Sequence, residues 1–175
     1  MGSLLVVTGP PGAGKSSVAQ VLADRVSPSV LVEGDAFYAF LASGAIPPWL
    51  TASHAQNLVV GRAAAAATAV FAADYETVYD GVLGPWQLAD FMHAGALDAL
   101  DYAIVLPPVE VCVDRVATRI GHGFGDEAAT RKMHAEFTEA VVDARHVFTD
   151  VVETPAAMAG LIVERRAAGA LLRSG

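Results

Sequence analysis

Residues 9–16 read GPPGAGKS, a stretch in which three glycines and two prolines precede a lysine and a serine. A continuous apolar run, Leu4–Val7, comes before this stretch, and apolar residues recur at helical spacing after it, from Val18 to Val26. The pattern predicts a turn that leads from a buried strand into a helix. Backbone N–H groups at the start of such a helix converge and favour a bound anion.

Gly9 to Ser16 fits the pattern G-x-x-x-x-G-K-[ST] of the phosphate-binding P-loop. Gly12 and Gly14 are expected to let the backbone approach phosphate without a Cβ in the way. Lys15 is expected to reach the β- and γ-phosphates of ATP, and the Ser16 hydroxyl to bind Mg²⁺. The predicted ATP-binding residues of the loop are Gly9, Pro10, Pro11, Gly12, Ala13, Gly14, Lys15, Ser16 and Ser17.

The bulk composition limits the class of protein. A chain of 175 residues is long enough for one domain, predicted over residues 1–175, and its net charge of −8 argues against nucleic acid as the main partner. The one cysteine, Cys112, is expected in the core; it excludes an internal disulfide and favours a cytoplasmic location. No signal peptide or membrane span is predicted, since the alanine-rich run Ala63–Ala73 is too short and suggests a buried helix.

Strand-like apolar runs alternate with helical patterns along the chain, which predicts a parallel sheet with helices on both faces. The expected strands are Leu4–Thr8, Val30–Glu33, Thr77–Tyr79, Tyr102–Leu106 and His146–Val151. The segment from about Pro155 to Leu172 is predicted to be a closing helix, with Thr154 as its N-cap.

Carboxylates follow two of these strands. Glu33 and Asp35 come at the end of the second strand, and Asp80 comes at the end of the third. Because ligands in open α/β sheets bind at the carboxyl ends of strands, we expect at least two of these side chains to face the phosphate site. Asp80 is predicted to hold Mg²⁺ or to orient a second substrate, although Asp-Gly is also a common turn pair.

Two classes of P-loop protein are excluded. Guanine-specific GTPases need N-K-x-D, but the only asparagine, Asn57, is followed by Leu58. Motor-type ATPases usually end a strand in Asp-Glu, whereas Asp80 is followed by Gly81.

The remaining pattern resembles the small P-loop kinases, such as adenylate kinase, gluconate kinase and chloramphenicol phosphotransferase. The similar segments are GDAFY after the second strand, YDG after the third, and RVATRIGHGF after the fourth. The resemblance implies a three-layer P-loop NTPase fold with a five-stranded parallel sheet, an acceptor-binding region at about residues 34–99 and a short lid at about residues 119–131. It also implies transfer of the γ-phosphoryl group of ATP to a small acceptor.

The chain departs from adenylate kinases at two positions. Those enzymes use two arginines to hold the acceptor's phosphate, and the matching positions here are Tyr38 and Gly84. Arg62 is also the only basic residue between Arg25 and Arg115, while a doubly charged acceptor normally meets two or more cations. We therefore expect a neutral or cationic acceptor that carries a hydroxyl group but no phosphate.

Aromatic residues gather in the expected acceptor region, which suits an aromatic or partly apolar ligand. Arg62 is expected either to orient the acceptor or to pair with an acid. The predicted acceptor-binding residues are Asp35, Phe37, Tyr38, Trp49, Arg62, Asp80 and Trp86.

The resemblance gives Asp35 the role of accepting the proton of the acceptor's hydroxyl group. In chloramphenicol phosphotransferase and shikimate kinase the matching aspartate has this role. Asp35 is also suited to cap a helix that begins near Ala36, and the two roles are compatible.

Three arginines are candidates for ATP binding. Arg115 and Arg119 lie four residues apart on one predicted helix without acidic partners at helical spacing, which suggests that an anion binds them. Arg119 matches the lid arginine of the family and joins Lys15 and Asp35 as a predicted catalytic residue. Arg131 follows Glu127 by four residues, so an ion pair is as well supported as ATP binding. His122 is expected to be a loop residue of the lid.

The sequence thus predicts an ATP- and Mg²⁺-dependent kinase that phosphorylates a hydroxyl group of a small molecule, with an antibiotic as the closest analogue. A gluconate-type sugar kinase is the nearest alternative. A nucleotide-binding switch protein without catalysis is the alternative from a different class.

Overall fold

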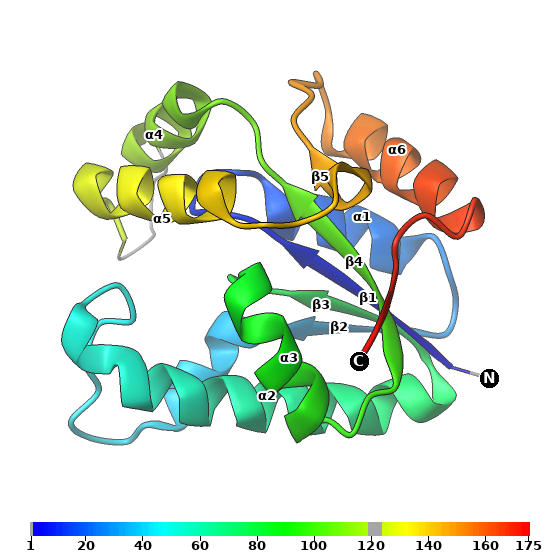
Figure 1. The fold of residues 1–175 in the computed structure, drawn as a ribbon, viewed down its shortest axis with the longest axis horizontal. Coiled ribbons are helices and arrows are strands. Elements are labelled where there is room, and N and C mark those ends of the chain that lie inside the picture. The colour runs from blue at the N-terminus through cyan, green and yellow to red at the C-terminus, as the bar shows by residue number, and fades with distance from the viewer. Residues whose placement is uncertain (1, 119–123) are drawn as a thin grey trace.

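The computed structural model describes residues 2–118 and 124–175 of the chain. Five parallel strands form the sheet in the order β2-β3-β1-β4-β5 (Figure 1). They are β1 (Ser3–Thr8), β2 (Ser29–Glu33), β3 (Glu76–Asp80), β4 (Ala99–Val105) and β5 (Val147–Phe148). A sixth strand, β6 (Leu172–Ser174), pairs antiparallel with the start of β4. The predicted α/β fold with a five-stranded parallel core is confirmed.

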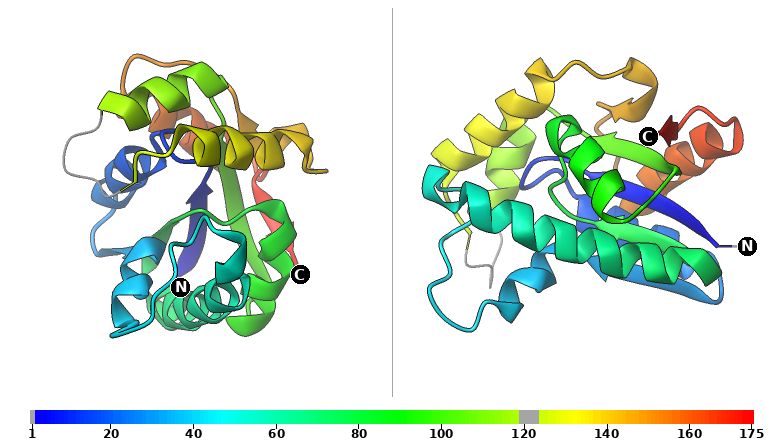
Figure 2. Two further views of the ribbon diagram at one scale, coloured as in Figure 1. Left: turned by 90° about the vertical axis from the view of Figure 1, so that its left-hand side faces the viewer. Right: turned by 60° about the horizontal axis from the view of Figure 1, so that its bottom comes forward.

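Helices cover both faces of the sheet, as Figures 1 and 2 show. One face carries α1 (Lys15–Asp24) and α6 (Pro155–Ala167), and the other carries α2 (His54–Asp74) and α3 (Pro85–Ala94). Successive residues of a strand point to opposite faces. Leu5 and Val7 of β1 therefore pack in the cluster of α1 and α6, while Leu4 and Val6 pack in the cluster of α2 and α3.

Two further helices, α4 (Val109–Thr118) and α5 (Glu127–Glu139), pack against each other beyond the carboxyl ends of β1 and β4 (Figure 1). Cys112 of α4 is fully buried in the cluster of α1 and α6, which confirms its expected place in the core. Phe137 of α5 is buried in the cluster of α2 and α3. The pair of helices is thus anchored to both sides of the sheet.

The end of the chain differs from the prediction. The last helix ends at Ala167 instead of continuing to Leu172, and residues 172–174 form β6. Gly169 has a positive φ of 69°, and the N–H of Ala170 donates to the carbonyl of Arg165 at 2.9 Å. A glycine in this left-handed conformation ends a helix and turns the chain back, here onto β4. The fifth strand is also shorter than predicted, spanning Val147–Phe148.

The alanine-rich helix is buried on one face only, which corrects the expectation of a buried helix. Ala64, Ala65 and Thr68 of α2 face the sheet, whereas Val59 and Val70 on the opposite face are 64% and 72% exposed. The reason is that α2 lies in an outer layer of the fold: it packs against the sheet, α3 and η1, and its remaining face is open to solvent. Across the part of the chain that the structure describes, no helix has the length and hydropathy required to cross a membrane.

Candidate active site

The P-loop connects β1 to α1 and curves around the start of the helix. Gly14 caps α1 with a positive φ of 93°, and Gly12 has a φ of 77°. A Cβ at Gly12 would overlap the backbone carbonyl of Cys112 in α4. The glycine at position 12 is therefore required by its conformation and by close packing on α4, which is a different reason from the approach to phosphate that the sequence suggested.

Several N–H groups of the loop are available for an anion. The N–H of Ala13 donates to the carbonyl of Pro10 at 3.2 Å, so this residue does not belong to the available set. The N–H groups of the first turn of α1 have no acceptor within the helix, as at any helix start. Lys15 and Ser16 line a large cavity together with Pro11, which places the end of the loop at the cavity's edge.

Arg115 of α4 supports the outer side of the loop. Its Nη1 donates to the backbone carbonyls of Ala13 at 3.1 Å and of Gly12 at 3.4 Å. It also lines a second cavity of about 260 Å³, which is bounded by Gly14 and Ser17 and by residues 150–155 in front of α6. This smaller cavity lies beside the first turn of α1.

The carboxylates at the ends of β2 and β3 lie together. The register pairs Glu33 of β2 with Asp80 of β3, so both strands end at the same level. Asp80 is only 8% exposed, and its Oδ1 has no hydrogen-bond partner among the described residues. Burial raises the pKa of Asp80, although nearby Lys15 and a hydrogen bond with the Ser16 hydroxyl oppose the rise.

Asp35 lies in a short 3₁₀ helix, η1 (Gly34–Phe40), in place of the helix expected to begin near Ala36. Glu33 is the capping residue of η1, and no side-chain cap forms, so the expected N-cap role of Asp35 is wrong. Burial together with the charge of Asp35 raises the pKa of Tyr38 to about 12. Asp35 lines the large cavity, and its carboxylate makes no capping hydrogen bond.

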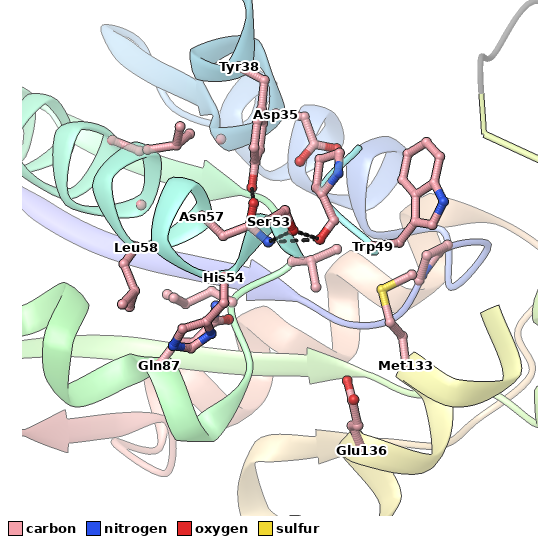
Figure 3. A pocket seen from close by; sticks show the side chains of 18 of the residues that line it. Asp35, Tyr38, Trp49, Ser53, His54, Asn57, Leu58, Gln87, Met133 and Glu136 are labelled. Carbon is pink, nitrogen blue, oxygen red and sulfur yellow. Dashed lines mark hydrogen bonds between the residues drawn. The ribbon is translucent and has the colours of Figure 1, made fainter. Parts of the chain in front are cut away.

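The large cavity has a volume of about 620 Å³ and continues from the P-loop between α2, α3 and α5. Figure 3 shows its side chains, with Asp35 and Tyr38 on one wall and Trp49 and Met133 on another. Most of its lining is apolar or aromatic, which is typical of a site for a small organic ligand. Of the predicted acceptor residues, those that line it are Asp35, Tyr38, Trp49 and Trp86.

Other predicted residues lie elsewhere. Phe37 packs against the core of the α2 and α3 face, since η1 contacts α2. Arg62 forms a bidentate ion pair with Asp90, with a closest distance of 2.7 Å, which is the acid-pairing alternative stated for it. Neither Phe37 nor Arg62 lines the cavity, and Asp80 lies beneath it, beside Ser16.

Of the lid residues, Arg131 contacts Glu110 of α4 at 2.7 Å and Glu127 at 2.9 Å. The pair with Glu110 joins α4 to α5, the pair with Glu127 lies within α5, and ATP binding by Arg131 stays a prediction. The predictions for Arg119 and His122 fall outside the described residues.

A hydrogen-bond clamp at the start of α2 holds the loop that carries Trp49. Asn57 accepts from the Tyr38 hydroxyl at 3.0 Å and donates to the Pro48 carbonyl at 2.7 Å. Gln56 bonds both the N–H and the carbonyl of Ile46, at 2.8 and 2.7 Å. The clamp fixes Trp49 in the cavity wall. This role of Asn57 was not predicted, because Tyr38 and Pro48 lie nineteen and nine positions away in the sequence.

The wall formed by α5 was also not predicted. Met133 and Glu136 line the cavity, and Lys132 lies beside Glu136 at 3.6 Å. Phe124 packs edge-on against Trp49 with ring centroids 4.9 Å apart. The cavity-lining residues of α5 recur at helical spacing, so periodicity alone would have shown one shared face without showing what that face meets.

A P-loop between the central strand and α1, with carboxylates at the ends of β2 and β3, defines the fold class of the small P-loop kinases. A family model described as an AAA domain matches residues 4–142. The chain belongs to this family. A search of the curated proteins found no match to the sequence.

Solved structures with the same fold cover nearly the whole chain. A sugar kinase from Janibacter sp. HTCC2649 is 22% identical, with a TM-score of 0.68 and coverage of 96% of this chain and 94% of its own. A gluconokinase from Sinorhizobium meliloti 1021 is 20% identical, with a TM-score of 0.64 and coverage of 96% and 93%. The tunicamycin resistance protein of Deinococcus radiodurans is 14% identical, with a TM-score of 0.69 and coverage of 95% and 96%. The predicted resemblance to small P-loop kinases is confirmed at the level of family and fold.

Proposed function

We propose that the protein is an ATP-dependent phosphotransferase that moves the γ-phosphoryl group of ATP to a hydroxyl group of a small, non-phosphorylated molecule. The observation that carries the proposal is one shared cavity. Lys15 and Ser16 of the P-loop and Asp35 all line it, and the remaining space is large and mostly apolar. A cavity that is continuous with the phosphate site suits a second substrate that receives the phosphoryl group.

The nucleotide would bind across both cavities. Its triphosphate would lie on the N–H groups at the start of α1 with Lys15 beside it, and its base would lie in the cavity between Arg115 and residues 150–155. Arg115 would act mainly by holding the carbonyls of Gly12 and Ala13, which keeps the loop in shape. Arg119 remains the proposed lid arginine over the phosphates.

The residues fit a magnesium ion. Asp80 offers a buried oxygen without a hydrogen-bond partner among the described residues, and the Ser16 hydroxyl lies beside it. A hydroxyl and a carboxylate are oxygen ligands of the kind that Mg²⁺ prefers. Ser16 and Asp80 would hold the ion, which, when bound, neutralises charge on the β- and γ-phosphates.

The transfer step needs mainly correct positioning. Asp35 accepts the proton of the acceptor's hydroxyl group as its oxygen attacks the γ-phosphorus. The bond from that phosphorus to the β,γ-bridging oxygen breaks, and the electron pair leaves with ADP. Lys15 stays beside the transferred group and stabilises its negative charge.

The apolar cavity supports an acceptor similar to an antibiotic of the chloramphenicol type. The fold that the chain shares with the tunicamycin resistance protein is compatible with this acceptor. A gluconate-type sugar kinase is the second candidate, which the near-complete coverage of the Sinorhizobium gluconokinase favours. A sugar acid would need cations near the acceptor, but the one arginine of that region is paired with Asp90, and Lys132 of the cavity wall lies 3.6 Å from Glu136.

The test is the substitution Asp35→Asn, assayed with a panel of alcohols, sugars and antibiotics. Turnover with any active acceptor should fall by about 100-fold or more, because the hydroxyl proton has no acceptor. Binding of magnesium ATP, measured by calorimetry, should stay within about twofold. Asp98→Asn, at an exposed residue before β4, is the matched control and should keep full activity.

Near-normal turnover in the Asp35→Asn variant would reject the role of Asp35. Slow ATP hydrolysis that no compound in the panel accelerates would favour a nucleotide-dependent switch instead.

A further inference from the structure

Most polar side chains around the large cavity already have partners within the protein. Asn57 and Ser53 are bonded to each other and to the loop before α2. Asp90 lines the cavity, but both of its carboxylate oxygens accept from Arg62. These groups shape the cavity and do not need hydrogen bonds from a ligand.

Two carboxylates remain that face the cavity from opposite sides. Asp35 lies at the end next to the P-loop, and Glu136 points into the cavity from α5 (Figure 3). Among residues 2–118 and 124–175, the one ion pair of Glu136 is with Lys132, at 3.6 Å and with 64% of the lysine side chain exposed. An exposed pair at this distance contributes little, so Glu136 remains available to another cation.

Apolar and aromatic surfaces flank Glu136. Met133 lies one helical turn before it, and Trp49 lies next to Met133 (Figure 3). Phe124 packs on Trp49, which holds the indole ring in place. A carboxylate next to aromatic and thioether surfaces is an environment that favours an organic ammonium group, which pairs with the charge and also interacts with the rings.

We propose that the acceptor is an amino alcohol with an apolar ring, whose protonated amine binds Glu136 while its hydroxyl group binds Asp35. This inference rests on the proposed function and narrows its acceptor to one chemical class. The ring would occupy the space between Trp49 and Leu58, which line facing parts of the cavity. A polyol would leave most of this apolar wall without a partner.

An anionic acceptor is the alternative that the same wall allows, because Lys132 also lines the cavity. Three compounds with one skeleton separate the possibilities. They are 4-(2-aminoethyl)benzyl alcohol, which is a cation, 4-propylbenzyl alcohol, which is neutral, and 3-[4-(hydroxymethyl)phenyl]propanoate, which is an anion; in each the ring separates the hydroxyl group from the variable end. Each is tested with the full chain and magnesium ATP for phosphoryl transfer, and with a non-hydrolysable ATP analogue for binding.

The amine should bind about tenfold more tightly than the neutral alcohol, and the anion should bind most weakly. Glu136→Gln should remove the preference for the amine and leave the neutral alcohol unchanged. Glu139→Gln, an exposed residue of the same helix, is the matched control and should keep the preference. Lys132→Gln should not weaken binding of the amine.

Equal binding of the amine and the neutral alcohol would overturn the inference, as would a preference that survives Glu136→Gln. Preferred binding of the anion with loss in Lys132→Gln would also overturn it, and so would the absence of binding by all three compounds. Transfer to the neutral alcohol alone would refute the inference and support the proposed function. Glu136-dependent binding of the amine without transfer to it would support amine binding by Glu136 and count against the proposed function.

Discussion

Asp80 combines burial with an incomplete set of hydrogen bonds. Its pKa is raised mainly by burial, from an ordinary value of 3.8. The folded protein therefore holds more protons than the unfolded chain as the pH rises above that value, and its stability falls through this range. A buried carboxylate with an unpartnered oxygen among the described residues fits a residue whose charged form binds a cation.

Replacing Asp80 by Asn should stabilise the ligand-free protein at neutral pH, because the amide is neutral and keeps the shape of the carboxylate. The expected gain is about 1 kcal/mol, or about 2–4 °C in Tm. The fall in stability as the pH rises above about 4 should become shallower. Thermal melts in EDTA across this range measure both effects.

The same variant should lose most of the added stability that magnesium and ATP give to the natural protein. An Asp80→Asn variant that is less stable at neutral pH, with full stabilisation by magnesium nucleotide, would contradict this account of the residue.

The site residues that lie close to one another in the sequence were the easiest to predict. The P-loop is continuous along the chain, so its pattern defines both the turn and its ligand. Asp35 and Asp80 could be placed because each follows a strand of a parallel sheet. Glu136 and Asn57 could not, because their roles depend on which distant segment docks against them.

At the scale of elements, Arg166 joins α6 to the sheet. Its Nε donates to Asp101 at 2.7 Å, its Nη2 donates to Ser3 at 2.8 Å, and its Nη1 contacts Glu76. The three side chains of the Arg166 group, Arg166, Glu76 and Asp101, are each less than one-quarter exposed. Glu76 begins β3 and Asp101 lies near the start of β4, at the end of the sheet away from the P-loop.

Arg166→Met should lower the free energy of unfolding by about 3 kcal/mol, because two partly buried carboxylates lose their partner. Urea unfolding measures the loss. Adding Glu76→Gln and Asp101→Asn should recover part of it, while nucleotide binding should be unchanged in the folded variant. A loss that the two further substitutions do not reduce would assign Arg166 a packing role only.

The clamp at the start of α2 gives a second prediction for an element. Asn57→Ala should raise the KM for the acceptor about tenfold, since Tyr38 and the loop with Trp49 lose their common partner. The KM for ATP should not change, because the hydrogen bonds of the clamp join Tyr38, the loop before α2 and the start of α2, and not the P-loop. Steady-state kinetics with each substrate varied in turn provides the measurement. A similar rise in both KM values would indicate a general loss of structure instead.

Elements with strong local signals were predicted, and those that depend on pairing were not. The five parallel strands could be recognised from their apolar runs. β6 was missed because Leu172–Ser174 has no pattern of its own and becomes a strand only by pairing with β4. The end of α6 could have been predicted from Gly169, because a glycine shortly after two arginines is a usual signal for the end of a helix.

At the scale of the whole molecule, the fold brings distant parts of the chain around one cavity. The P-loop near the start of the chain, the loop before α2, α3 and α5 each supply a wall. Because the net charge is −8, we expect only a few defined groups to bind phosphate, chiefly Lys15 and the N–H groups at the start of α1. Loss of one of these groups should therefore be visible in the binding of the nucleotide.

Calorimetric titration of the folded protein with magnesium and a non-hydrolysable ATP analogue tests the central claim, that the loop at residues 9–16 binds a nucleoside triphosphate. We expect one site per chain, and we expect Lys15→Ala to weaken it by about 100-fold or more while the variant remains folded. No heat with the natural protein, or equal binding by the Lys15→Ala variant, would contradict the claim.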